Sequence, residues 1–263
     1  MDERPLMNLS HDLMGMYTIW LRDVRRFFRD KARIAGATIQ PALFLIFLGT
    51  GLSRGLAISF PGNDRTGYLT FIYPGIIGMS ILFTAVFSAI SIVWDREVGF
   101  LKEVMVAPVS RWAVALGKAM GGSTVAMFQG ALMLVFAPFV GVKLGIGTIL
   151  ILIPLMLFVG LSLTSMGIVA AAYMNSMQGF TVIMNFLMLP MFFLSGAMFP
   201  IEKLPFWMGI LVRINPLTYG VDLLRSATIT MNHFPLLMDI GVVGGFGCIM
   251  TLLAVIIFSR QEG

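Results

Sequence analysis

The amino-acid sequence predicts an all-α integral membrane protein with six transmembrane helices. Composition is the first reason: 58% of the 263 residues are hydrophobic and only 12% are charged, whereas soluble domains carry about 25% charged residues. A soluble chain this poor in charge would expose large apolar patches and aggregate. Length is the second reason, because about six apolar stretches reach the roughly 20 residues that a helix needs to cross the hydrocarbon core.

The first 33 residues are expected to form a cytosolic, interfacial amphipathic helix. Apolar residues recur at helical spacing on one side: Leu13, Met16, Trp20, Val24 and Phe27. Arginines cluster on another side: Arg22, Arg25, Arg26, Arg29 and Arg33. This pattern suits a helix in the lipid headgroup plane, with Trp20, Arg22, Arg25, Arg26 and Arg29 as its interfacial residues. A helix packed on a soluble domain is the alternative, but the chain leaves no soluble domain to receive it.

Residues 34–258 are expected to form one transmembrane domain, followed by a short cytosolic tail, 259–263. Pro41 is expected to kink the first span, and Pro190 lies inside the fifth. Gly117 with Gly121, and Gly241 with Gly245, fit the close packing of helices through small residues. The six spans are predicted at 34–56, 68–94, 112–140, 146–173, 179–199 and 236–258.

Charge predicts the orientation, because cytosolic loops of membrane proteins carry an excess of Lys and Arg. Six spans place both termini on the same side. Twelve of the 18 Lys and Arg lie on that side and six on the other. Both termini and the loop 95–111 are therefore expected in the cytosol, and segment 200–235 outside. We expect a multi-pass protein of the plasma (bacterial inner) membrane, without a cleavable signal peptide.

Several functions lack the residues that they need. Gly117-Lys118 is not a phosphate loop, because Trp112 occupies the position of the required first glycine and Ala119 replaces Ser or Thr. Cys248, His11 and His233 are isolated and suggest neither a disulfide nor a metal site. Lys118 and Asp239 are interpreted as interfacial groups, since a proton-coupled pump usually carries several buried charges. The basic residues flank the spans, which argues against nucleic-acid binding.

A charged insert, 95–103, interrupts the apolar pattern between the second and third spans. It surrounds Gly99 and Phe100 with the charges of Asp95, Arg96, Glu97, Lys102 and Glu103. A short helix of this kind, ended by Pro108, can present charges and one aromatic ring to a soluble partner. The alternative is an ordinary solvated loop.

The outer segment 200–235 is only half apolar and contains several prolines. It is expected to form two short amphipathic helices divided at Asn215-Pro216. Irregular backbone at membrane depth must be buried in protein or line a cavity. These helices therefore cap the outer face or re-enter the membrane, unless the segment is a simple external loop. Its candidate residues are Pro200, Leu204, Pro205, Asn215, Pro216, Tyr219, Asp222 and Arg225.

The chain resembles the type-2 ABC exporter permeases in two signatures, above all those of daunorubicin-type drug exporters and nodulation-factor exporters. The cytosolic signature is matched by Glu97-Val98-Gly99-Phe100-Leu101-Lys102-Glu103 and by Ala107-Pro108-Val109-Ser110-Arg111. The outer signature is matched by Phe199-Pro200, Leu204-Pro205 and Asn215-Pro216-Leu217-Thr218-Tyr219, with Asp222 and Arg225. Lys102 departs from the pattern, because many relatives carry an acidic residue at this position.

The resemblance implies a permease dimer, most simply a homodimer, paired with two copies of a cytosolic ATPase subunit that would bind ATP and magnesium. This chain itself would need no cofactor. The insert would be the coupling helix, with the N-terminal helix as a second contact. Under this hypothesis, the ATPase contact residues are Asp95, Arg96, Glu97, Gly99, Phe100, Lys102, Glu103, Pro108 and Arg111.

We therefore expect the permease subunit of an ATP-driven exporter that works by alternating access. Because the spans offer few polar groups, its cargo is expected to be lipophilic or lipid-linked: a drug, a glycolipid or a polysaccharide. A membrane scaffold that docks a cytosolic partner without transport is the alternative. A secondary transporter is disfavoured by the missing internal repeat.

Overall fold

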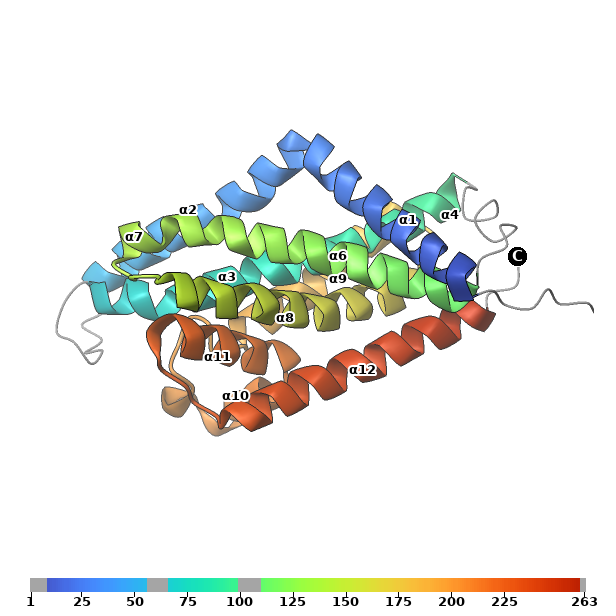
Figure 1. The fold of residues 1–263 in the computed structure, drawn as a ribbon. Coiled ribbons are helices and arrows are strands. Elements are labelled where there is room, and N and C mark those ends of the chain that lie inside the picture. The colour runs from blue at the N-terminus through green and yellow to red at the C-terminus, as the bar shows by residue number, and fades with distance from the viewer. Residues whose placement is uncertain (1–8, 56–65, 99–109, 261–263) are drawn as a thin grey trace, which may run out of the picture.

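Long helices run along a common axis in the computed structural model, which describes residues 9–55, 66–98 and 110–260 (Figure 1). Within these residues, all regular structure is helical, which confirms the predicted all-α class. The helices are α1 (Leu9–Arg29), α2 (Lys31–Gly55), α3 (Thr66–Ser88), α4 (Ile90–Glu97), α6 (Arg111–Met133), η1 (Leu134–Phe136), α7 (Ala137–Val140), α8 (Ile146–Ala172), α9 (Met177–Phe193), η2 (Ile201–Lys203), α10 (Phe206–Ile214), α11 (Pro216–Ile229) and α12 (Leu236–Arg260).

Five segments of the described chain are long and apolar enough to cross a membrane. They are Lys31–Leu48, Gly67–Glu97, Arg111–Val140, Ile146–Ala172 and Leu236–Ser259. The predicted fifth span, 179–199, corresponds to α9, which has 17 residues. A helix of that length is about 26 Å long, slightly shorter than the hydrocarbon core of about 30 Å. The chain is thus an apolar multi-helix protein, and the count of six spans stays a prediction.

Helix α3 is the centre of the bundle. In the span that α3 begins, 72% of the residues in the 18-residue apolar stretch are buried in the protein. The corresponding share is 17–44% in the other four spans. It packs against α2, α6, α8 and α11. The hydroxyl of Tyr73 on α3 donates to the carbonyl of Met133 on α6 at 3.1 Å, so even the polar atom of this buried ring has a partner. A displacement of α3 would therefore disturb its packing against these four helices.

Close helix approach depends on glycines that were only partly predicted. A Cβ built at Gly117 would lie 2.9 Å from the backbone oxygen of Met16, and one at Gly121 would lie 3.1 Å from Cβ of Asp23. This pair on α6 therefore lets α1 pack closely, as expected. The prediction for Gly241 and Gly245 was wrong, because nothing lies within 4 Å of a Cβ at either position. The close contact of α12 is made instead by Gly247, against Ser162 of α8.

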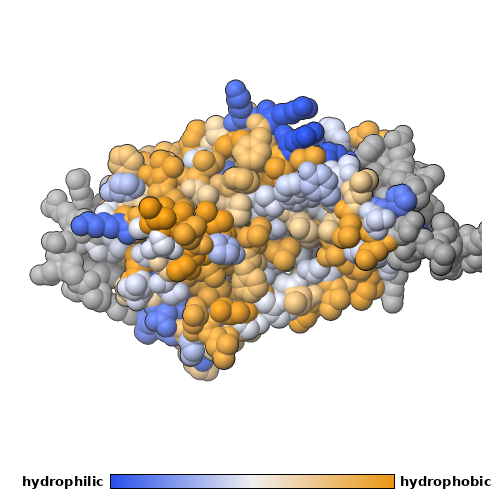
Figure 2. Space-filling view, in the orientation of Figure 1, coloured by the Kyte–Doolittle hydropathy of each residue, from blue (hydrophilic) through white to orange (hydrophobic). Residues whose placement is uncertain are grey.

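Helix α1 lies along α6 and turns sharply into α2. The indole N–H of Trp20 donates to Oγ1 of Thr124 at 3.0 Å, and Phe27 is buried, so part of the apolar side expected to face lipid packs on protein instead. Asp30 divides the two helices, because its carboxylate accepts the backbone N–H of Arg33 at 3.0 Å and caps α2. The two helices form a V (Figure 1), and hydrophilic surface gathers over its corner (Figure 2).

Candidate functional site

A buried charge network joins α1, α4 and α6 near one end of the bundle. Oδ2 of Asp95 lies 3.0 Å from both Nζ of Lys118 and Nη2 of Arg22. Lys118 also lies 3.6 Å from Oδ2 of Asp23 and donates to Oγ of Ser91 at 2.9 Å. Asp95 and Lys118 are 5% and 6% exposed. The network satisfies charges that would be costly if they were buried alone, and it ties α4 to α1 and α6.

This arrangement corrects the interpretation of Lys118 as an interfacial group, because its amine is buried in an ion-pair cluster. It also places Asp95 inside the protein, where it contacts this chain's own cations. The sequence contained one usable signal. Asp95 directly follows the predicted second span, and Lys118 lies six residues into the third. Antiparallel neighbouring helices bring these two depths to the same end of the bundle.

Arg96 and Glu97, the two residues after Asp95, connect α4 to the turn between α8 and α9. Nη1 of Arg96 donates to the carbonyls of Met174 at 2.8 Å and Ala172 at 3.2 Å. A cation is favourable there, because the last carbonyls of a helix have no partner within the helix. Oε1 of the exposed Glu97 accepts the backbone N–H of Met177, the first residue of α9, at 3.2 Å. The end of α4 is thus bound to two helix termini.

The start of α6 is held in a similar way. The backbone N–H of Ser110 donates to Oδ1 of the buried Asp12 of α1 at 2.7 Å. Nη1 of Arg111 donates to the carbonyl of Ser259, near the end of α12, at 2.8 Å. Both flanks of the segment 99–109 are therefore attached to the helix bundle. Five predicted contact residues lie outside the described residues: Gly99, Phe100, Lys102, Glu103 and Pro108.

The opposite end of the bundle carries the two short helices α10 and α11, which meet at Asn215 as the sequence predicts. Oδ1 of Asn215 accepts the backbone N–H of Leu217 at 3.0 Å and caps α11. Its Nδ2 donates to the carbonyls of Met191 at 2.6 Å and Leu194 at 3.1 Å, at the end of α9. The hydroxyl of Tyr219 donates to the carbonyl of Arg213 at 2.8 Å. One side chain therefore caps one helix and holds it against the end of another.

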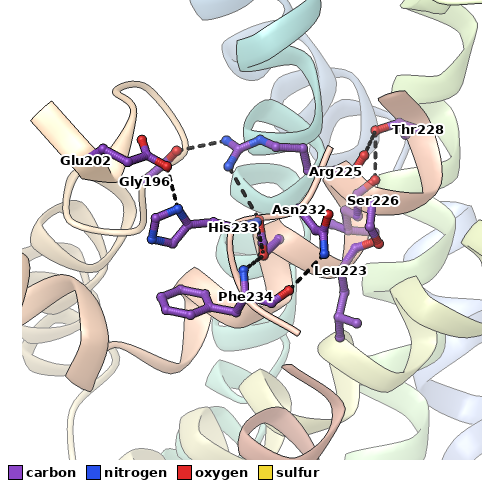
Figure 3. Close-up of polar contacts among 11 residues, drawn as sticks. Gly196, Glu202, Leu223, Arg225, Ser226, Thr228, Asn232, His233 and Phe234 are labelled. Carbon is purple, nitrogen blue, oxygen red and sulfur yellow. Dashed lines mark hydrogen bonds and ion pairs between the residues drawn. The ribbon is translucent and has the colours of Figure 1, made fainter. Parts of the chain in front are cut away.

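Asp222 and Arg225 bind the loops around α11, and Figure 3 shows Arg225 beside Gly196. Oδ2 of Asp222 accepts the backbone N–H groups of His233 and Phe234, each at 2.8 Å. Nη2 of Arg225 donates to the carbonyl of Gly196 at 2.8 Å, a residue with φ of +67°. The guanidinium carbon of Arg225 also lies 4.4 Å from the ring centroid of Phe71 on α3. Both side chains are almost fully buried, and they tie the turn after α9 to the centre of the bundle.

The same end contains groups that sequence reasoning missed. Nδ1 of His233 lies 2.6 Å from Oε1 of Glu202 (Figure 3), a contact across 31 residues for which the sequence offers no signal. Burial raises the pKa of Glu202, but its backbone and His233 hydrogen bonds lower it more, so the pKa falls below its usual range. Asp239 is fully buried beside the carboxylate of Asp222, and its oxygens accept no hydrogen bond from a donor group among the described residues. This corrects its interpretation as an interfacial group.

The remaining outer residues have simpler roles. Pro200 and Pro205 directly precede η2 and α10, and Pro216 is the first residue of α11, where the missing N–H of proline costs no helical bond. Leu204 directly follows η2 and donates its N–H to the carbonyl of Ile201 at 3.3 Å. The described residues of this segment therefore form helix boundaries and loop anchors.

Comparisons with known proteins agree with this architecture. The family described as ABC-2 type transporter matches residues 14–229. The putative transport permease ycf38 of Cyanophora paradoxa is 30% identical over 209 residues, which cover 77% of this chain and 71% of that protein. Nodulation protein J of Rhizobium leguminosarum bv. viciae is 25% identical and the inner membrane transport permease YadH of Escherichia coli K12 is 24% identical. These alignments cover 94% and 95% of this chain and 95% and 96% of those proteins.

The matched region contains both predicted signatures, so the resemblance seen in the sequence is confirmed. Permeases of this family carry no nucleotide-binding domain, and their ATPase is a separate subunit. The chain is accordingly a transporter subunit, and ATP hydrolysis belongs to the separate ATPase subunit of this family. The chain belongs to the ABC-2 type transporter family of multi-pass membrane permeases.

Proposed function

We propose that this chain is the membrane subunit of an ATP-driven exporter, with both termini and the segment 95–111 in the cytosol. Two copies of the chain would pair with two copies of the ATPase. The segment 99–109 would be the coupling element, and the hydrolytic cycle of the ATPase would drive alternating access. The cargo would be lipophilic or lipid-linked, because the apolar spans offer few polar groups to bind a hydrophilic solute.

The observation that supports coupling is the attachment of both flanks of this segment. Asp95 connects the incoming flank to α1 and α6, and Arg96 connects it to the end of α8 and the turn that follows. Arg111 connects the outgoing flank to the end of α12. A displacement of the segment would therefore move several helix ends together, instead of being absorbed by a free loop.

Co-purification in detergent with the cognate ATPase tests the proposal. The test variant is Phe100→Ala/Glu103→Ala, which keeps the helix anchors Glu97 and Arg111. A control variant, Glu202→Ala/Phe206→Ala, removes an acid and an aromatic ring at the opposite end of the bundle. We expect the wild type and the control to retain the ATPase and the test variant to lose it. Retention by all three proteins would refute the coupling role.

Reconstituted vesicles separate an exporter from the scaffold alternative. An exporter would raise ATP hydrolysis by its partner in a cargo-dependent way, whereas a scaffold would bind the ATPase without that response. Cross-linking of purified protein tests the homodimer, for which we expect one species of twice the monomer mass.

A further inference from the structure

A lateral cleft of about 330 Å³ opens between α2 and α3, beside the corner where α1 meets α2. This volume lies at the lower end of the range for small-molecule sites, about 300–1,000 Å³. Gly36 and Gln40 of α2 are exposed at its mouth, and Met79 and Thr84 of α3 are buried at its floor. The cleft is thus open on the side where α2 faces outward.

The walls of the cleft are apolar along α3. Phe83 and Phe87 stand one turn apart on α3, and Phe27 of α1 closes the end near the corner. A surface of this kind suits a hydrocarbon chain, because burying apolar area is favourable whatever the orientation of the chain.

One cation stands at the corner end of the cleft. Nη2 of Arg33 donates to the carbonyl of Phe87 at 3.3 Å. In the described part of the protein, no carboxylate lies within ion-pair distance of its guanidinium. The nearby acids are engaged elsewhere: Asp30 accepts the backbone N–H of Arg33, and Asp23 lies between Arg22 and Lys118. The site therefore has a positive charge at one end of an apolar wall, on which Asp30 and Asp23 act only from beyond ion-pair distance.

Polar groups continue from Arg33 along α2. Pro41 has no N–H to donate to the carbonyl of Ala37, one turn earlier in the helix, and both residues line the cleft. The amide of Gln40 is exposed beside them at the mouth of the cleft. These groups lie about 6–10 Å along the helix from Arg33, where they suit ester or hydroxyl groups between a charged head and its chain.

We propose that this cleft is the entry site for cargo and that it takes an anionic amphiphile from the inner leaflet. A phosphate head would bind Arg33, and a single acyl chain would lie along Phe87, Phe83 and Met79. The inference rests on the proposed function for the orientation, which places the α1–α2 corner at the cytosolic headgroups. Charge complementarity selects this occupant over a neutral or cationic lipid.

The test uses lysophosphatidic acid with a diazirine at the end of its chain, bound to the permease alone in nanodiscs of zwitterionic lipid. Irradiation and peptide mapping should place the label on α2 or α3 near the cleft. Unlabelled lysophosphatidic acid should compete at least tenfold better than lysophosphatidylcholine of equal chain length. Arg33→Gln should weaken labelling at least tenfold, and Arg33→Lys should restore most of it.

Gly36→Leu provides a steric test with a matched control. Nothing lies within 4 Å of a Cβ at Gly36, so leucine should fill the cleft without a clash and abolish labelling. Gly245→Leu makes the same change on the exposed side of α12, where a Cβ also meets nothing within 4 Å, and should leave labelling unchanged.

Three outcomes would overturn the inference: equal competition by the zwitterionic lipid, label outside α2 and α3, or loss of the dimer in Gly36→Leu, which would assign the cleft to a second copy of the chain. Because this assay contains no ATPase, it is independent of the coupling test. An unlabelled cleft with intact ATPase co-purification refutes only the entry site. A labelled cleft without ATPase binding refutes only the proposed exporter.

Discussion

Removal of the Asp95 carboxylate should destabilise the protein by about 3 kcal/mol. Asp95→Asn keeps the shape of the side chain but leaves the buried Lys118 with only Asp23, 3.6 Å away, as a charged partner. Removing one partner of a buried ion pair costs about 3–5 kcal/mol. The lower figure applies because Asp23 remains and because Arg22, with a 37% exposed side chain, can turn toward solvent. A change of about 3 kcal/mol is roughly a hundredfold in the unfolding equilibrium.

A double-mutant cycle isolates this interaction. Asp95→Leu/Lys118→Met replaces the charges with apolar side chains of similar size, and such replacements are often neutral or stabilising. We expect the double variant to unfold within about 1 kcal/mol of the wild type, although each single variant is much weaker. Unfolding would be followed in mixed micelles of increasing SDS content by tryptophan fluorescence and circular dichroism. Wild-type stability in Asp95→Asn, or additive losses in the double variant, would refute the reasoning.

Three further changes have outcomes that the structure predicts. Asn215→Ala removes a helix cap and two hydrogen bonds to the end of α9. It should lower the free energy of unfolding by about 1–3 kcal/mol in the same SDS titration. The control Asn232→Ala, at an exposed position, should change that free energy little. Gly117→Leu should separate α1 from α6, because its Cβ would meet a backbone oxygen at 2.9 Å. Faster hydrogen exchange in α1 would report this, with Gly245→Leu as control, and unchanged exchange would contradict the contact. Asp239→Asn removes one of two buried carboxyl groups that face each other, Asp239 and Asp222, and supplies an amide donor in its place. The midpoint of thermal unfolding should therefore rise, and a fall would show that the carboxyl group of Asp239 stabilises the fold.

Local patterns predicted much of the fold. Apolar runs located the long helices to within a few residues, because a bilayer imposes length and hydropathy on any helix that crosses it. The division at Asn215 was predictable because asparagine followed by proline ends one helix and starts the next. The predicted third span is less regular than expected. Its helix passes through η1 before Pro138, since proline cannot donate to the carbonyl four residues earlier.

Tertiary contacts were not predictable from the same patterns. Asp95 and Lys118 carry opposite charges in consecutive spans, but only the packing of α1 against α6 brings Arg22 and Asp23 to the same place. Gly241 and Gly245 have the spacing of a packing motif, yet the neighbouring helix passes Gly247 instead. Spacing specifies which residues share a helix face, and it does not specify which face meets another helix. The entry cleft was missed for the same reason, because α2 and α3 each contribute only half of it.

The residues that hold the chain on either side of segment 99–109 are different from the residues proposed to recognise the ATPase. Arg96, Glu97 and Arg111 bond to this chain's own helix ends, so contacts within the chain hold the frame on either side of the segment. Mutations between the anchors would therefore be free to follow changes in the ATPase surface during evolution. We expect a chimaera that receives residues 99–109 from a paralogous permease to fold normally and to recruit the ATPase of the donor.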